Sequence, residues 1–320
     1  MNRKKMLGLF LIYTNLIYCQ NSIICANKQF EAAEYYAYKN KHEIAINYYQ
    51  KAFKMGFLAN NESYGNAAKS ALIAGNDKLA YSFFEKAVEN GTTLNQLASD
   101  SLFMFFLSTS KGNKLKKSYS KLRINYLSNI DINSYAEIKK LIDIDQLIRT
   151  QEAEQWGISQ LSANDQNKLF MQIDSGYIVN HLLTILNKEI PNAKGLGDLR
   201  KDFYIFFLHQ MSEVNYKKLF PFIDKCIEKG ILTYTQKALI LDRYSLITKG
   251  YTIYGTRTVM NDSDELELQP IQDIKNIDNL RSKMGILPLS IFYSTYMPEA
   301  KLPKEYKNEI IIENFLNCNN

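Results

Sequence analysis

One stretch of the chain repeats its residue classes at a fixed offset of 35 residues, and this limits the possible folds more than any other feature. Five small or aromatic residues meet small or aromatic residues one offset later, and only Tyr36 changes class. The paired sets are Ala33, Tyr36, Ala45, Tyr49 and Ala52, then Ala68, Ala71, Ala80, Phe84 and Ala87. A further shift meets the larger residues Phe103, Leu115, Tyr119 and Leu122. The pattern predicts a helical repeat array with a degenerate third unit that acts as a cap.

The stretches Tyr35 to Gly56 and Tyr64 to Gly91, with the turn Gly75-Asn76-Asp77, resemble tetratricopeptide repeats. In that family small residues let two antiparallel helices approach closely. The resemblance implies an α-solenoid over residues 27–129 whose groove binds a peptide or a partner protein. Two alternatives stay open: an unrelated helical bundle, and an array whose only role is to dock onto the rest of the chain.

From Ile130 onward the chain changes character, and its apolar residues recur at helical spacing within successive segments. The low counts of proline (6) and glycine (14) also favour helices. Six helices are expected, at Ser134 to Arg149, Asn164 to Ile173, Tyr177 to Glu189, Asp198 to Glu213, Tyr216 to Lys229 and Thr233 to Lys249. The β-branched run Thr252 to Val259 and the alternating run Glu265 to Gln269 predict a β-hairpin. A short helix, Asn276 to Met284, follows. The predicted fold class is therefore mainly α, with an α+β domain at 130–320.

The first residues have the pattern of an export signal. Arg3, Lys4 and Lys5 precede an apolar run from Met6 to Ile17, which is too short to span a membrane. We expect a signal peptide at 1–19 and an exported protein, periplasmic or secreted, without a transmembrane span. Cleavage after Ala26, lipid attachment at Cys19 and a buried helix at Met6 to Ile17 are the alternatives.

Charge and cysteine content restrict the function classes. Loss of the three N-terminal basic residues reduces the formal charge from +6 to +3, so the chain lacks the strong positive charge of many nucleic-acid-binding proteins. One basic cluster, Lys111 to Arg123, is interpreted as a solvated helix face, with phosphate binding as the alternative. We expect no nucleic-acid partner. Three cysteines remain after cleavage, which permits one disulfide at most, and Cys226 is expected to be a buried free thiol.

A second resemblance covers roughly Leu141 to Tyr293. Its motifs are Leu241-Asp242-Arg243, Gly250, Tyr254-Gly255-Thr256, Pro270-Ile271-Gln272-Asp273, Ile277-Asp278, Arg281 and Gly285, with Asp145-Gln146, Arg149 and His209 upstream. Together they resemble an uncharacterised bacterial family, one of the domains of unknown function. The chain departs from that family at Ile253 and Leu280, where Gln and Arg are common. The resemblance implies an architecture and a set of positions rather than a reaction.

The residues themselves suggest two kinds of site. Asp242 and Arg243 lie in apolar surroundings on the predicted helix Thr233 to Lys249, so each needs a partner. The available partners are Arg257, Arg281, Asp273 and Asp278. These charges form either a buried ion network that holds the hairpin on the helix, or a cleft in which an anionic group binds. The ligand-binding candidates for such a cleft are Arg243, Tyr254, Thr256 and Arg281.

His209 lies four residues before Glu213 on another predicted helix, a spacing that lets a carboxylate orient a general base and that also describes an ordinary surface contact. The catalytic candidates are His209, Glu213 and Asp242. No phosphate-binding loop, nucleophile elbow or set of closely spaced metal ligands occurs, so no cofactor or metal is expected. Two functions remain: an exported interaction or scaffold protein, and a hydrolase-like enzyme or anion-binding protein centred on His209, Asp242, Arg243 and Tyr254.

Overall fold

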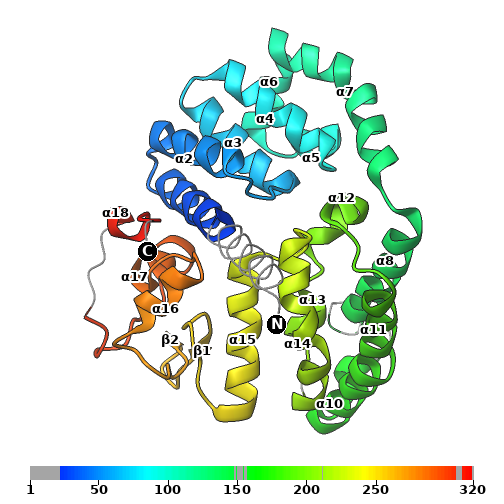
Figure 1. The fold of residues 1–320 in the computed structure, drawn as a ribbon, viewed down its shortest axis with the longest axis vertical. Coiled ribbons are helices and arrows are strands. Elements are labelled where there is room, and N and C mark those ends of the chain that lie inside the picture. The colour runs from blue at the N-terminus through cyan, green and yellow to red at the C-terminus, as the bar shows by residue number, and fades with distance from the viewer. Residues whose placement is uncertain are drawn as a thin grey trace, which may run out of the picture.

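The computed structural model describes residues 22–147, 149, 154, 157–210, 212–307 and 312–318, and these are mainly helical (Figure 1). A small two-stranded antiparallel sheet is the β component. The expected class, mainly helical with a β-hairpin, is confirmed at this level. The solenoid arrangement and the boundary between 129 and 130 stay predictions. The predicted signal peptide, residues 1–19, which includes Cys19, lies outside the described residues.

Paired helices make up the first part of the chain. Residues 22–38 are helical and are followed by α2 (His42–Lys54), α3 (Asn61–Ile73), α4 (Asp77–Glu89), α5 (Leu94–Ala98), α6 (Ser101–Ser108) and α7 (Ser110–Asn129). Ala45, Ala80 and Ala87 are fully buried, as small residues at close helix contacts must be. Asn60 starts α3 with a capping box, because its side chain accepts from the Ser63 N–H.

The middle of the chain forms a second helical group. It comprises α8 (Ile132–Leu147), the 3-10 turn η1 (Ile158–Gln160), α10 (Ala163–Met171), the π-helical segment η2 (Gln172–Ile178), α11 (Val179–Lys188), α12 (Ala193–Leu196), the 3-10 segment η3 (Gly197–Lys201), α13 (Ile205–Leu208), α14 (Glu213–Glu228) and α15 (Tyr234–Lys249). Two predictions were wrong here. The helices expected at Asn164 to Ile173 and Tyr177 to Glu189 are joined through η2, and the one expected at Asp198 to Glu213 is broken into η3 and α13.

The C-terminal segment contains the hairpin β1 (Thr258–Met260) and β2 (Leu266–Leu268), then α16 (Ile277–Lys283), α17 (Leu289–Tyr296) and α18 (Ile312–Phe315). In the antiparallel pair Thr258 lies opposite Leu268 and Met260 lies opposite Leu266. Both strands are shorter than expected. Among the described residues, no helix combines the length and apolar content that a bilayer crossing requires.

The hydrophobic core consists of two clusters that do not follow the predicted domain boundary. One contains the paired helices together with C-terminal residues such as Ile277, Phe292 and Phe315. The other runs from Ile138 to Ile240 and includes Ile286. Figure 1 shows why: the chain turns back so that the red C-terminal end lies beside the blue N-terminal helices.

The first helix, residues 22–38, packs against both clusters through apolar residues, and it also has buried polar groups. Asn27 donates to the Gly285 carbonyl at 2.7 Å, and Glu31 accepts from the Thr235 hydroxyl of α15. Cys25 is joined to Cys318 by a disulfide, with 5.8 Å between the Cα atoms. Cys226 is a buried free thiol, as expected. This helix therefore connects segments that are distant in sequence.

Glu31 makes the stability of this junction depend on pH. Burial raises the pKa of the Glu31 carboxyl to about 7, because the loss of water around its charge outweighs the hydrogen bond from Thr235 and the charge of Arg281. The folded state thus favours the protonated carboxyl. The contribution of Glu31 to the free energy of unfolding is fully present below the unfolded pKa of about 4.3 and is lost as the pH rises to about 7. We expect Glu31→Gln to match the wild type near pH 4 and to be more stable at pH 8, by up to about 3 kcal/mol.

Urea unfolding from pH 4 to pH 8 measures this difference. The exposed Glu43→Gln, on α2, serves as the control and should follow the wild type throughout. Identical unfolding curves for Glu31→Gln and wild type at pH 8 would contradict the expected penalty for a buried charge.

Candidate functional site

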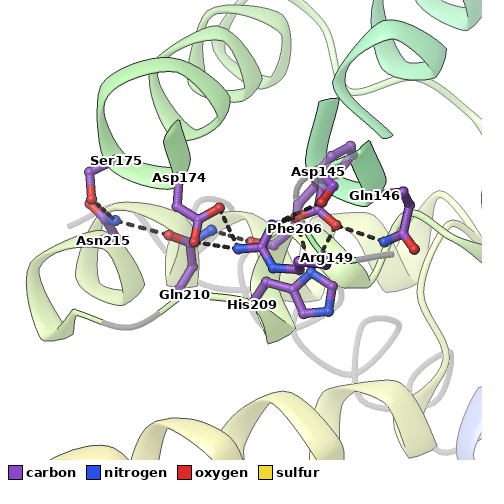
Figure 2. Close-up of polar contacts among 9 residues, drawn as sticks. All are labelled: Asp145, Gln146, Arg149, Asp174, Ser175, Phe206, His209, Gln210 and Asn215. Carbon is purple, nitrogen blue, oxygen red and sulfur yellow. Dashed lines mark hydrogen bonds and ion pairs between the residues drawn. The ribbon is translucent and has the colours of Figure 1, made fainter. Parts of the chain in front are cut away.

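A cluster of charged side chains joins three elements that are distant in sequence (Figure 2). Asp145 comes from the end of α8, Arg149 from the turn after it, Asp174 from η2, and His209 from the residue that ends α13. Asp145 and Asp174 have side chains only 1% exposed, whereas the His209 side chain is 26% exposed. The cluster thus has a buried acidic interior and one accessible imidazole.

Asp145 is the centre of the cluster. Its carboxylate lies 2.8 Å from Nδ1 of His209 and accepts hydrogen bonds of 2.8 Å from Arg149 and from Gln146. A buried carboxylate with this many partners has a fixed position. It therefore fixes the orientation of the His209 ring.

Arg149 connects the two carboxylates. Its Nη2 contacts both oxygens of Asp174, at 2.8 and 2.6 Å, while Nη1 contacts Asp145. Burial raises the pKa of Asp174 above its usual value, although Arg149 acts in the opposite direction. With both carboxylates ionised and the imidazole neutral, the cluster has one more negative than positive charge. This excess can compensate a proton taken up by His209.

The π-helical segment explains how Asp174 reaches this position. A π-helical turn adds a residue to the helical repeat and so turns the following side chains about the axis. Here η2 lies between α10 and α11, and Asp174 on it meets Arg149. Such interruptions recur at functional sites. We missed Asp174 in the sequence; the only signals were an acid between apolar residues and the nearby Gly176.

A second set of hydrogen bonds holds the residues after His209. Gln210 is 1% exposed and donates to the Phe206 carbonyl at 2.6 Å. Asn215 donates to Gln210 at 2.9 Å and to Ser175 of η2 at 2.7 Å. The backbone that carries His209 is thus tied to the same π-helical segment as Asp174 (Figure 2).

The predicted partner of His209 was wrong. Glu213 begins α14, whereas His209 follows the end of α13, so the two do not share a helix. Glu213 instead pairs with Lys217 at 2.8 Å on the surface. The carboxylate that contacts His209 is that of Asp145, which is 64 residues away in sequence.

Asp242 has a structural role in the described chain. It is fully buried and accepts hydrogen bonds of 2.7 Å from the backbone N–H groups of Ile253, Tyr254 and Thr256. The Thr256 hydroxyl adds a fourth at 2.8 Å. The expected ion partners of Asp242 are replaced by backbone donors, so this residue holds a loop rather than facing a cleft.

Arg281 holds the same loop from the other side. It is fully buried and donates to the carbonyls of Tyr254 and Leu287. Gly255 allows the turn, since its φ is +61° and an added Cβ would lie 2.9 Å from Ile271. The Tyr-Gly-Thr motif is therefore explained by backbone geometry, and Arg281 is not accessible to a ligand as the sequence suggested.

Arg243 interacts electrostatically with Arg257. Burial lowers the pKa of Arg257, and the charge of Arg243 lowers it further. Within the described residues, Nε of the partly buried Arg257 has no hydrogen-bond partner. Arg243 also acts electrostatically on Tyr216. Neither arginine forms an ion pair with an acidic side chain of the described chain, although the charge of the buried Asp242 also acts on Arg257.

Comparisons with protein-family models, curated proteins and solved structures found no match to this chain. Both resemblances noted from the sequence therefore stay predictions. In the described part of the chain, no three His, Cys, Asp or Glu side chains are grouped as metal ligands would be.

The role of Asp242 is testable by an isosteric change. Asp242→Asn keeps the shape but turns one acceptor into a donor facing N–H groups, so we expect a loss of roughly 2 to 4 kcal/mol in the free energy of unfolding. Urea unfolding measures the loss, and hydrogen exchange should show faster exchange at Ile253, Tyr254 and Thr256. The exposed Asp262→Asn is the control. Unchanged exchange at these amides would contradict the structural role.

The tautomer of His209 is a second test. Because Nδ1 faces a carboxylate, it should carry the proton in the neutral ring and leave Nε2 unprotonated. Long-range ¹H–¹⁵N NMR at about pH 8 distinguishes the tautomers, and the chain has only three histidines to assign. His181, whose Nδ1 lies 2.8 Å from the Tyr177 carbonyl, is an internal reference. Asp145→Asn should change the His209 signals alone; a protonated Nε2 in the neutral wild type would refute the assignment.

Proposed function

We propose that the chain is a hydrolase-like enzyme in which His209 is the general base. The observation that carries the proposal is the contact of His209 Nδ1 with the buried Asp145, which holds a side chain that is 26% exposed and leaves Nε2 free of the carboxylate. A general base needs a fixed orientation, a free nitrogen and compensation of the charge it acquires. This arrangement supplies all three.

In the proposed reaction, Nε2 of His209 removes a proton from a water molecule, and the resulting hydroxide attacks the acyl or phosphoryl centre of an ester. The bond to the leaving group then breaks, and the imidazolium returns the proton to the leaving oxygen. Water is the proposed nucleophile because His209 forms its side-chain hydrogen bonds in the described chain with Asp145 alone.

We propose an anionic substrate because of Arg243 and Arg257. These arginines interact electrostatically and form no ion pair with an acidic side chain of the described residues, and Arg257 also interacts electrostatically with Tyr204, which immediately precedes α13. Since α13 packs against α15, which carries Arg243, this arginine belongs to the same helical group as His209. An arginine pair is well suited to a carboxylate or phosphate group.

Partner binding by the N-terminal helices is the second proposed function, and the observation in its favour is the complete burial of the small residues at the 35-residue offset.

Export is also proposed. The Cys25–Cys318 disulfide supports it because such bonds persist mainly in oxidising compartments. Cleavage after Cys19 would keep Cys25 in the chain, whereas cleavage after Ala26 would remove it.

Ester hydrolysis provides the direct test. We expect the wild type to release nitrophenol from at least one of p-nitrophenyl acetate, p-nitrophenyl phosphate and bis(p-nitrophenyl) phosphate. His209→Ala and Asp145→Asn should each lower the rate by about 100-fold or more. Arg243→Ala should mainly raise KM. The control is His181→Ala, since this exposed histidine lies on α11 and contacts Tyr177. Absence of turnover on all three esters, or full activity in His209→Ala, would refute the proposal.

A further inference from the structure

A cavity of about 480 Å³ lies between the N-terminal helices and the middle helical group. Its lining comes from the loop between α2 and α3, from α3, α4 and α7, and from the segment α12–η3. The volume is within the range of small-molecule sites. His209, Asp145, Arg243 and Arg257 are not among its lining residues, so it is separate from the site above.

The shape of one wall depends on a glycine. Gly197 has a φ of +55°, and an added Cβ would lie 2.3 Å from the hydroxyl oxygen of Tyr126. Tyr126 in turn donates to Asp198 at 2.8 Å and accepts from its backbone N–H at 3.1 Å. Only glycine allows this close approach, so the wall has a defined geometry.

Arg200 gives the cavity an uncompensated charge. It is only 7% exposed, and its guanidinium donates to the carbonyls of Leu58 and Ala59. Among the described residues, no acidic side chain forms an ion pair with it. Burial lowers the pKa of Arg200 to about 10, which reflects the cost of the isolated charge. An anion bound in the cavity would relieve this cost.

The other charged residues leave the cavity positive. Lys86 and Lys194 line it together with one acid, Glu89. Glu89 is paired with Lys86 at 2.7 Å, so these two charges offset each other. Arg200 and Lys194 therefore remain, and both lie on the α12–η3 side of the cavity.

The rest of the lining is suited to hydroxyl groups. Four asparagines line the cavity: Asn60, whose side chain caps α3, and Asn90, Asn125 and Asn129. Asn90 and Asn129 each use the amide nitrogen for a backbone carbonyl, at 2.8 and 2.6 Å, and form no other side-chain hydrogen bond in the described chain. Phe57, Tyr64 and Tyr126 add aromatic rings. Amides bind hydroxyls, and ring faces pack against the C–H faces of a sugar.

We propose that this cavity binds a monosaccharide-sized anion, a sugar acid or sugar phosphate, with the anionic group at Arg200 and Lys194 and the hydroxyls at the asparagine side. The charge and the amides lie on different lining segments, which matches a ligand with one charged end and several hydroxyls. The proposal does not depend on the activity of His209.

Isothermal titration calorimetry with defined probes tests the ligand class. Glucuronate, galacturonate and glucose 6-phosphate are the anionic sugars, glucose is the neutral control, and acetate and inorganic phosphate supply charge without a sugar. We expect at least one anionic sugar to bind with a Kd below about 1 mM and at least tenfold more tightly than glucose, acetate or phosphate. Failure of all three anionic sugars would overturn the proposal, and so would equal binding of glucose or of the simple anions.

Variants locate the binding site. Lys194 is exposed, so Lys194→Ala should leave the melting temperature unchanged and weaken binding of the anionic sugar at least threefold. Arg200→Gln keeps a donor for the loop carbonyls and should weaken binding at least tenfold. Lys116→Ala on α7 removes the same charge from an exposed position outside the cavity lining and is the matched control. Wild-type affinity in Lys194→Ala and Arg200→Gln would place the ligand elsewhere and overturn the assignment.

Discussion

The buried polar helix at residues 22–38 is the constraint on which the rest of the fold depends. Asn27, Lys28 and Glu31 are all buried, although they belong to residue types that favour the surface. A buried polar group is costly unless it forms hydrogen bonds, and the partners here come from the far end of the chain: the Gly285 carbonyl, the Asn317 carbonyl and Thr235. The helix therefore requires α15 and the C-terminal segment to fold around it. The Cys25–Cys318 disulfide closes the same junction, and its span of 293 residues removes much of the freedom of the unfolded chain.

Buried charges serve two different purposes in this protein. Asp242 and Arg281 bind backbone groups of neighbouring loops, and they thereby fix segments that have no regular secondary structure. Asp145 differs because its partners are side chains, one of which, His209, remains accessible. The Asp242 carboxylate binds groups of one loop and so stabilises that loop. The Asp145 carboxylate instead orients an accessible imidazole, which stability alone does not require. This difference separates the structural polar cluster from the proposed catalytic one.

The two proposed ligand sites use different sides of the middle helical group. The His209 cluster depends on α8, η2 and the end of α13, while the cavity wall is built from α12 and η3 just before α13. The segment from α12 to His209 thus contributes to both. Its short helices and 3-10 turns replace the single long helix expected from apolar spacing, and the irregular backbone allows Arg200 and His209 to face different sites.

The sequence by itself determined the mainly helical class, the position of the hairpin, the buried small residues such as Ala80 and the buried thiol of Cys226, because helical period and strand propensity act over a few neighbouring residues. It also singled out Asp145, Arg149 and His209, but not their contact. Only the tertiary structure decided that His209 meets Asp145 instead of Glu213, that Asp174 joins them, and that Asp242 binds backbone. These contacts depend on how distant helices pack, and on a π-helical turn that local spacing does not encode. The physical reason is that periodicity specifies which face of an element is buried, while its polar partners are set by whichever segment covers that face.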